Sequence, residues 1–179
     1  MNKIVDPERL EEFKREHETK RKNPKNYPSE TKFERAKRHI EQGRKKGHWI
    51  WYMFPQAKGE VEHHKKECGS STSKKFAIQS IEEAIAFLEH PILGKNYFSL
   101  TEITAEQLRK GLSLKEIFSR DAKKVRCSLI LFRRAALLAQ YRGVLSADSF
   151  KRFSKNANSI LSHAENEGIH SCEYASSFE

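Results

Sequence analysis

Residues 121–143 read DAKKVRCSLILFRRAALLAQYRG, and this stretch predicts the longest helix of the chain, from about residue 122 to residue 141. Asp121 suits the position that caps the start of a helix, and Gly143 suits its end because glycine adopts left-handed backbone angles at little cost. The apolar side chains form a face wider than the stripe of a surface helix. They are Val125, Leu129, Leu131, Phe132, Ala135, Ala136, Leu138 and Ala139. We therefore expect this helix to be central.

Capping boxes, in which Ser or Thr is followed three positions later by Glu or Gln, predict further helices. They begin at Thr31, Ser80, Thr104 and Ser113. The helix after Ser80 should end at His90-Pro91, with Gly94 in the next turn, and the short helix after Thr104 should end at Gly111. Phe150, Phe153, Ile160 and Leu161 allow one more helix, and only residues 49–54 alternate like a strand. The prediction is an all-α fold: a compact single-domain multi-helix bundle with a long central helix.

Composition divides the 179 residues into three parts. We predict a basic N-terminal arm over residues 1–28, a helical domain over residues 29–165 and a frayed C-terminal tail over residues 166–179. Residues 1–47 contain 15 Lys and Arg against 9 Asp and Glu, which is typical of a solvated, partly disordered segment. Leu10 and Phe13 could form the apolar face of one short helix there, so the arm either docks on the domain or stays free.

The formal net charge of +10 favours acidic partners, such as a phosphate-bearing small molecule or nucleic acid. Cys68, Cys127 and Cys172 have no paired spacing, so neither a disulfide framework nor a zinc ribbon is predicted and a reducing compartment fits. No apolar run approaches the roughly 18–20 residues that cross a bilayer, and the N-terminal residues lack the apolar core of a secretion signal. We expect a cytoplasmic protein without a membrane span.

The candidate binding site lies in the stretch from Gly47 to Gln56, GHWIWYMFPQ, which contains both tryptophans. Trp and Tyr combine a large apolar body with a polar tip and therefore suit a pocket that is half apolar and half wet. In an extended strand, Trp49 and Trp51 would share a face on which a base or a sugar could stack. The alternative is that the stretch fills the core, with His48 bonded to the backbone.

Polar residues in and beside this stretch complete the predicted pocket. His48 is the candidate catalytic residue, because imidazole donates and accepts protons near neutral pH. Gln56 offers an amide for oriented hydrogen bonds. Arg44 and Lys45 can neutralise a phosphate, although cations are also favoured at the end of a helix by its dipole.

A second set of polar residues lies at the start of the long helix. Asp121 is the second candidate catalytic residue, and Lys124, three positions later, is a candidate ligand-binding residue that can face it. Arg126 and Ser128 belong to the same set. The alternative is a helix cap with a surface ion pair.

Several site classes find little support. His63, His64 and Cys68 crowd one loop with three glutamates, but adjacent histidines rarely converge on a metal, and we predict no metal site and no cofactor. The chain contains no GxSxG elbow, no GxGxxG and no GxxxxGK[ST], which excludes the familiar hydrolase, dinucleotide and P-loop motifs.

Three strings of residues carry a resemblance to a known family over about residues 31 to 135. They are Gly43-Arg44-Lys45 with His48-Trp49-x-Trp51-x-x-Phe54-Pro55-Gln56, then Ser80-Ile81-x-Glu83-Ala84 with Phe87-Leu88-x-His90-Pro91-x-Leu93-Gly94, then Ile117-Phe118 with Asp121-x-x-Lys124 and Ser128-x-x-Leu131-Phe132. The chain resembles the bacterial family called domain of unknown function 1810. The resemblance implies an all-helical fold with a pocket and assigns no reaction.

This chain departs from that family at two places. Lys58-Gly59-Glu60-Val61 replaces the usual Gly-Leu-Gly stretch and leads into a charged insertion. Asn96-Tyr97 stands where an Arg-Leu pair is usual. An anion site that depended on that arginine would be lost or altered here.

Three functions remain open. The first is a small enzyme or ligand-binding domain for a phosphate-bearing, nucleotide-like metabolite, in which Trp49 or Trp51 stacks the ring, and hydrolysis or N-glycosidic cleavage is the reaction to test. The second is a nucleic-acid-binding module that uses the basic arm. The third is a protein-interaction module that uses the arm and the loop over residues 57–75 as contact surfaces.

Overall fold

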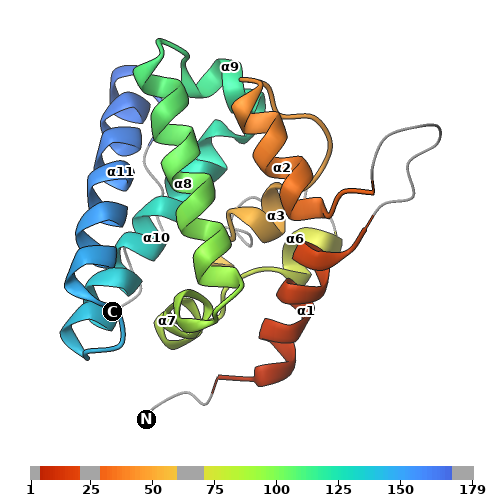
Figure 1. The fold of residues 1–179 in the computed structure, drawn as a ribbon, viewed down its shortest axis with the longest axis vertical. Helices are drawn as coiled ribbons and strands as arrows, with labels where there is room; N and C mark the ends of the chain where they lie inside the picture. The colour runs from red at the N-terminus through yellow and green to blue at the C-terminus, as the bar shows by residue number, and fades with distance from the viewer. Residues whose placement is uncertain (1–4, 21–28, 60–70, 171–179) are drawn as a thin grey trace.

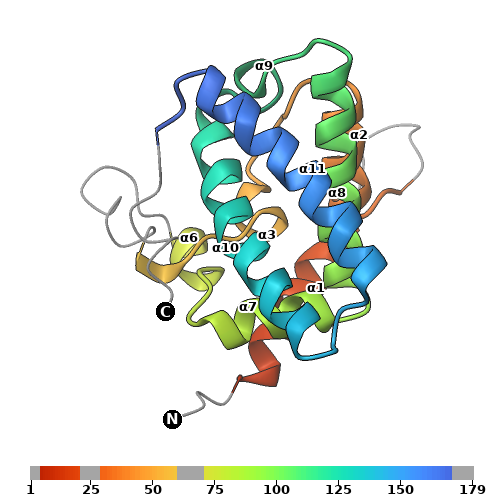
Figure 2. The same cartoon turned by 90° about the vertical axis from the view of Figure 1, so that its left-hand side faces the viewer.

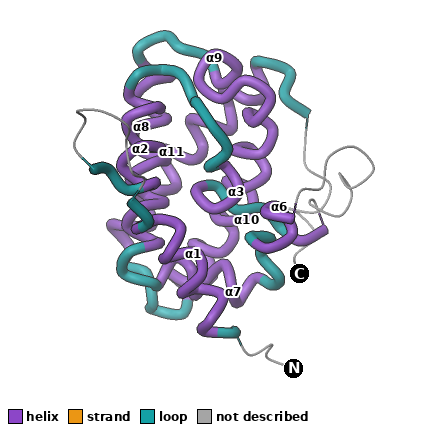
Figure 3. The backbone as a smooth tube through the Cα atoms, turned by 90° about the vertical axis from the view of Figure 1, so that its right-hand side faces the viewer, coloured by secondary structure: helices purple, strands orange, loops and turns teal. Residues whose placement is uncertain are grey.

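The computed structural model describes residues 5–20, 29–59 and 71–170, and the structural statements below concern these residues. Their regular structure is helical (Figures 1 and 3). The elements are α1 (Pro7–Glu18), α2 (Lys32–Glu41), α3 (Ile50–Met53), α6 (Ser71–Lys75), α7 (Ile81–Glu89), α8 (Leu93–Arg109), α9 (Leu114–Phe118), the 3-10 turn η1 (Ser119–Asp121), α10 (Ala122–Tyr141) and α11 (Ala147–Asn166). In this part of the chain, pairing between extended segments is confined to isolated bridges.

Helix α10 organises the bundle. It packs against α7 and forms a helical hairpin with α11, and α8 packs against α11, α2 and α7 (Figures 1 and 2). Both α10 and α11 are 20 residues long. The predicted all-α bundle with a long central helix is therefore confirmed.

A cluster of aromatic rings joins these helices at the core. The ring of Tyr97 from α8 lies 4.4 Å from that of Phe132 on α10, and Phe87 from α7 lies 5.2 Å from Phe132. The Tyr97 hydroxyl is hydrogen-bonded to Ser128 over 2.9 Å. Burial raises the pKa of Tyr97, so the phenol stays neutral and the hydrogen bond satisfies a polar group that would otherwise be costly to bury.

Helix α1 is docked on the bundle. Phe13 lies 5.2 Å from Phe87, ring to ring, and is buried. Arg9 donates to the Glu83 carboxylate over 2.6 Å and to the Ala77 carbonyl over 2.7 Å. The apolar contact of Phe13 and the polar contacts of Arg9 thus hold residues 7–18 of the predicted arm against the domain.

His17 forms a buried polar contact beneath α1. Its Nε2 lies 2.8 Å from the Tyr52 carbonyl and its Nδ1 lies 3.1 Å from the Asn96 amide nitrogen. Both contacts are satisfied when Nε2–H donates to the carbonyl and Nδ1 accepts from Asn96, so the ring is neutral. Burial lowers the pKa of His17 from 6.5 to about 4, against the opposing effects of the Tyr52 hydrogen bond and the Glu16 charge. Asn96 is thus used to hold α1.

We expect the free energy of unfolding to fall as the pH decreases from 6.5 towards 4. In this window the unfolded chain binds a proton on His17 that the folded chain does not, whereas above pH 6.5 both states are neutral and the stabilisation is complete. The loss from His17 should reach about 2 kcal/mol at pH 5 and about 3 kcal/mol at pH 4, since one pH unit corresponds to about 1.4 kcal/mol. Urea unfolding followed by circular dichroism at pH 7, 6 and 5 measures it.

The matched variant is His17→Gln, whose neutral amide can keep both hydrogen bonds. Its loss of stability between pH 7 and pH 5 should be smaller than that of the wild type by about 2 kcal/mol. An unchanged pH dependence in this variant would show that His17 does not control the acid sensitivity.

Three of the four predicted capping boxes start helices. Thr31 and Ser113 form complete boxes before α2 and α9, and Ser80 caps α7 by accepting from the Glu83 amide. The fourth prediction was wrong, because Thr104 lies inside α8 and its hydroxyl donates to the Leu100 carbonyl four residues earlier. A threonine in the middle of a helix makes this back-bond, so the same sequence pattern does not distinguish it from a cap.

Two further local predictions were wrong. Residues 49–54 are not a strand, because Ile50–Met53 forms the helical turn α3, and Trp49 and Trp51 therefore do not share an extended face. Gly94 does not lie in a turn but in the first turn of α8, where its amide donates to the His90 carbonyl.

The C-terminal end of α11 is fixed to the bundle. The Glu167 carboxylate accepts from the Leu114 and Lys115 amides over 2.7 and 3.1 Å, and the Ile169 carbonyl accepts from Arg126. The predicted tail beyond residue 170 lies outside the described residues.

Cys127 on α10 is disulfide-bonded, so the expectation of reduced cysteines without a disulfide was wrong for this residue. None of the described helices has the length and apolar character needed to cross a membrane.

Candidate functional site

The loop between α2 and α3 carries half of the predicted site residues. Gly43 ends α2 in a left-handed conformation with φ of 70°, and the Lys45 amide donates to the Ile117 carbonyl of α9 over 2.6 Å. Gly47 is also left-handed, with φ of 77°. Arg44 and His48 are exposed on this loop, whereas Trp49 at its end is buried.

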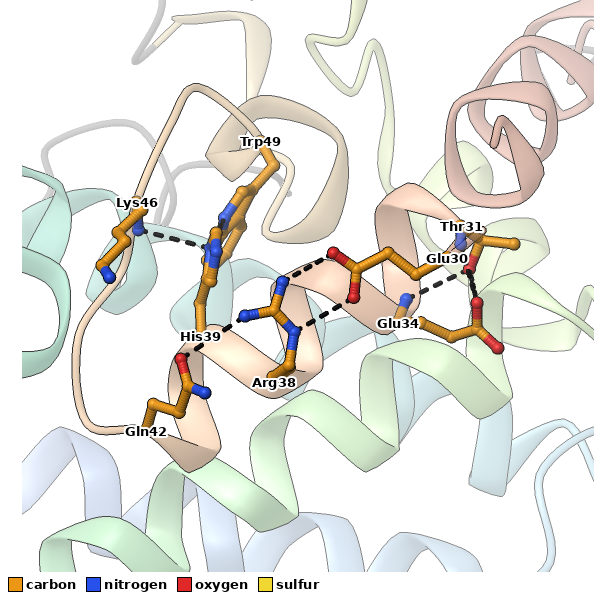
Figure 4. Close-up of polar contacts among 8 residues, drawn as sticks. All are labelled: Glu30, Thr31, Glu34, Arg38, His39, Gln42, Lys46 and Trp49. Atoms are coloured by element: carbon orange, nitrogen blue, oxygen red, sulfur yellow. Dashed lines mark hydrogen bonds and ion pairs between the residues drawn. The ribbon is translucent and has the colours of Figure 1, made fainter. Parts of the chain in front are cut away.

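His39 on α2 anchors the end of the loop (Figure 4). Its Nδ1 accepts from the indole Nε1 of Trp49 over 3.1 Å and from the Lys46 amide over 3.3 Å. Burial, and then the nearby charges of Arg38 and Arg35, lower the pKa of His39 to about 4. The ring is therefore neutral, with its proton on Nε2, and serves as an acceptor that fixes the indole and the backbone of residue 46.

Asp121 forms an ion triad with two lysines near Trp49. Its Oδ2 lies 2.7 Å from Nζ of Lys45 and its Oδ1 lies 2.6 Å from Nζ of Lys124. Lys45 Nζ is 5.0 Å from the centre of the Trp49 ring, and Lys124 Nζ is 4.0 Å from that of Trp51. Cations over indole faces are attracted by the ring quadrupole, so the triad also holds both tryptophans.

The triad keeps the carboxylate of Asp121 ionised. Burial alone would raise the pKa of Asp121, but the hydrogen bonds and charges of Lys124 and Lys45 outweigh it and leave the pKa below its ordinary value. Asp121 occupies the N-cap position of α10, yet its side chain accepts no capping hydrogen bond from the helix. The expectation of a side-chain cap was therefore wrong, because the carboxylate is used by the two lysines.

A small cleft opens beside His48. Its lining combines cationic and aromatic side chains from α2, the loop and α3, namely Lys32, Arg35, Lys46, Gly47, His48, Trp49 and Tyr52. We call it the basic cleft. Its volume is about 50 Å³, which accommodates a few water molecules or one group of similar size.

The cations of the basic cleft differ in how they are neutralised. Lys32 pairs with Glu16, and on the same helix Arg38 pairs with Glu30 outside the cleft (Figure 4). Within the described residues, neither Arg35 nor Lys46 forms an ion pair with a carboxylate. Among the described residues, Arg35 and Lys46 therefore bring positive charge to the cleft without a carboxylate in direct contact, which is the local arrangement that favours an anion.

Six of the eight predicted site residues thus fall into two groups. His48 and Trp49 line the basic cleft, whereas Lys45, Asp121, Lys124 and Trp51 form the triad and its aromatic contacts. Arg44 is exposed and does not line the cleft. Gln56 is 2% exposed, and both of its amide atoms are buried without a hydrogen-bonding partner in the described part of the chain.

Sequence reasoning missed His39, Lys32, Arg35 and Tyr52. His39 directly precedes Ile40 on the buried face of α2, and a polar residue beside an apolar stripe was the one signal available for it. Nothing in the sequence indicated that Lys32 and Arg35 would face the loop.

Among the described residues, no group of three or more His, Cys, Asp and Glu side chains is placed to hold a metal ion. His63, His64 and Cys68 lie outside these residues.

A solved structure and a protein family resemble this chain, and neither description names a function. A crystal structure of the conserved hypothetical protein Rv1873 from Mycobacterium tuberculosis is 26% identical to this chain, with a TM-score of 0.64 over 95% of each chain. No curated protein matches. The model of a family described as a protein of unknown function, DUF1810, matches residues 26–164. The match includes the loop, α3 and the triad, and the chain accordingly belongs to the DUF1810 family.

Proposed function

We propose that the protein binds a phosphate-bearing small molecule and that the basic cleft receives the phosphate group. The observation that carries the proposal is the convergence of Arg35, Lys46 and His48 on one cleft in which Arg35 and Lys46 have no carboxylate partner among the described residues. Guanidinium and ammonium groups form strong charge-assisted hydrogen bonds with phosphate oxygens. The net charge of +10 favours the approach of such a ligand.

The dimensions of the cleft define how the ligand would lie. A cleft of about 50 Å³ takes an anionic group and not a whole nucleotide, because pockets that enclose such ligands measure roughly 300–1,000 Å³. The ring of a nucleotide-like ligand would therefore lie outside the cleft. Stacking on Trp49 is disfavoured because its ring is buried, and the face of Trp51 already carries Lys124.

The proposed chemistry assigns different roles to the two candidate catalytic residues. His48 lines the cleft and is exposed, so its imidazole can exchange a proton with a bound phosphate ester and with solvent. Asp121 is held by Lys45 and Lys124, and we assign it to positioning the loop through Lys45. Hydrolysis or N-glycosidic cleavage of the phosphate-bearing ligand remains the reaction to test first.

We expect Arg35→Ala and Lys46→Ala each to weaken the binding of ribose 5-phosphate and AMP by about tenfold, since one charge-assisted hydrogen bond contributes roughly 1.5 kcal/mol. Isothermal titration calorimetry against ribose 5-phosphate, AMP, adenosine and inorganic phosphate measures the effect. Adenosine, which has no phosphate, should bind at least tenfold more weakly than AMP.

Arg152→Ala is the matched control, because Arg152 is a similarly cationic residue of α11 with an exposed side chain that does not line the basic cleft. It should leave all four affinities within about twofold of the wild type. Equal affinities in the Arg35 and Lys46 variants and the wild type, or equal binding of adenosine and AMP, would contradict the proposal.

The described part of the N-terminal arm does not favour the nucleic-acid alternative. Helix α1 carries five acidic and three basic residues, namely Glu8, Glu11, Glu12, Glu16 and Glu18 against Arg9, Lys14 and Arg15. Arg9 and Lys14 are also paired with glutamates. Because phosphate contacts from basic residues dominate nucleic-acid affinity, α1 adds little to such a surface.

A further inference from the structure

The hairpin of α10 and α11 bears a groove on its surface, away from the residues of the basic cleft. The α10 wall is formed by Ile130, Arg133, Arg134 and Leu137, and the α11 wall by Phe150, Ser154 and Asn158. These residues recur at intervals of three or four positions, so each wall is one continuous helix face. We call this feature, of about 630 Å³, the hairpin groove.

Large apolar side chains are exposed at and beyond one end of the groove. Leu137 is 54% exposed, Tyr141 87% and Val144 46%. Leu137 lines the groove, Tyr141 follows it one turn later on α10, and Val144 lies in the connection to α11. Apolar residues gathered beside a groove are typical of a surface that another molecule covers.

The charged side chains among the described lining residues of the groove are basic. Arg133 and Arg134 line it, no described lining residue is acidic, and the sequence contains no Asp or Glu between Asp121 and Asp148. Arg133 donates to the Asn158 side chain over 2.9 Å, which leaves its positive charge without a carboxylate in that contact. Arg142, in the connection, is 47% exposed, with Glu82 of α7 at 3.9 Å. The complementary partner surface is therefore apolar and acidic.

We propose that the hairpin groove binds an acidic amphipathic helix of another protein. A helix seated between two helices presents anchors at positions i, i+3, i+4 and i+7, which matches the spacing of the two walls. From Ile130 to Tyr141 the groove and its apolar extension run for about 16 Å, since a helix rises 1.5 Å per residue, and this length suits about three turns of a partner helix. Leucines of the partner contact Leu137 and Phe150, and its glutamates pair with Arg133 and Arg142.

Charge also decides against two other occupants. A second copy of this chain would place Arg133, Arg134 and Arg142 of both molecules against one another, and like charges across an interface oppose association. An anionic membrane would satisfy the charge, but its flat surface does not fill a groove between two helices.

The probe is a fluorescein-labelled peptide of about 14 residues that places leucines at the i, i+3, i+4 and i+7 spacing and glutamates elsewhere. Fluorescence anisotropy should show micromolar binding to the full chain. Leu137→Glu and Arg133→Glu should each weaken it by at least about tenfold, because each introduces an unpaired acidic group opposite the glutamates. Both side chains lie at the surface, so circular dichroism should show an unchanged fold. Arg152→Glu, on the same hairpin but outside the groove, should change the affinity by less than about twofold.

Three results would overturn the proposal. The first is equal binding of a peptide in which lysines replace the glutamates. The second is no peptide binding together with binding to vesicles of phosphatidylserine and phosphatidylcholine that Leu137→Glu abolishes, which would assign the surface to a membrane. The third is a dimer in analytical ultracentrifugation that Leu137→Glu dissociates, which would assign it to a second copy. Because the basic cleft is intact in both groove variants, their affinity for AMP reports separately on the proposed function.

Discussion

Replacing Gly94 by alanine is expected to destabilise the protein by about 3 kcal/mol or more, because the added methyl group has no space. A Cβ atom on Gly94 would lie 2.0 Å from the Leu88 carbonyl oxygen and 2.8 Å from its carbon. Both are backbone atoms of α7, so no side-chain rotation relieves the overlap, and α7 and α8 would have to separate. These two helices carry Phe87 and Tyr97 into the aromatic core, and their separation would disturb it. Urea unfolding followed by circular dichroism measures the loss.

Gly143→Ala is the matched control. Gly143 ends α10 with φ of 75°, and nothing lies within 4 Å of a Cβ atom built there. Its replacement should cost only about 1–2 kcal/mol, the penalty for a left-handed alanine. At Gly94, which lies in a helix, propensity alone would make alanine more favourable by about 1 kcal/mol. A Gly94→Ala protein as stable as the wild type would therefore show that the contact between α7 and α8 is looser than described.

The fold could be predicted where the signal was local. The capping residues Thr31, Ser80 and Ser113 act within one turn of helix, and the apolar face of α10 spans enough residues to identify a buried helix. The prediction of a helix start at Thr104 was wrong because its hydroxyl donates to a backbone carbonyl in the middle of α8. The same four residue types can occur in the interior of a helix and at its start, so the pattern alone does not distinguish the two.

The prediction of a strand around the two tryptophans was wrong for a different reason. Alternation over six residues fits a strand, but Ile50, Tyr52 and Met53 are all buried, so burial follows tertiary packing and not the two-residue period. Pro91 before Gly94 indicates a turn, whereas the structure requires glycine at this position because the Leu88 backbone approaches it closely. Long-range contacts of this kind leave no local pattern in a sequence.

The candidate site was predicted in part for the same reason. The sequence drew attention to His48 and Trp49 because they are neighbours in an aromatic run, and the structure places both in the basic cleft. Lys32 and Arg35 reach the cleft from α2, and His39 reaches Trp49 from ten residues away. The sequence singled out both Lys45 and Asp121 as candidates without indicating that they bind each other.

The ion pair between Lys45 and Asp121 leads to the second large prediction. The side chains are only 8% and 17% exposed, and their charged atoms are 2.7 Å apart. Asp121→Asn keeps the size of the side chain but leaves the ammonium groups of Lys45 and Lys124 without their shared counter-charge. Breaking a buried pair in this way should lower the free energy of unfolding by about 3 kcal/mol.

A double-mutant cycle separates the pair from other effects of the substitution. Lys45→Met removes the buried charge while its stem can still cover the Trp49 ring, so Asp121→Asn should cost about 2 kcal/mol less in the Lys45→Met background than in the wild type. The same cycle on the exposed pair of Arg152 and Glu102, whose side chains are 76% and 44% exposed, should give a coupling energy of at most about 0.5 kcal/mol. Equal coupling energies for the two pairs would refute the structural role of Asp121. Asp121 itself does not line the basic cleft. A large coupling energy for Lys45 and Asp121, together with a loss of AMP affinity in Asp121→Asn, would therefore show that the triad positions the loop that forms the cleft.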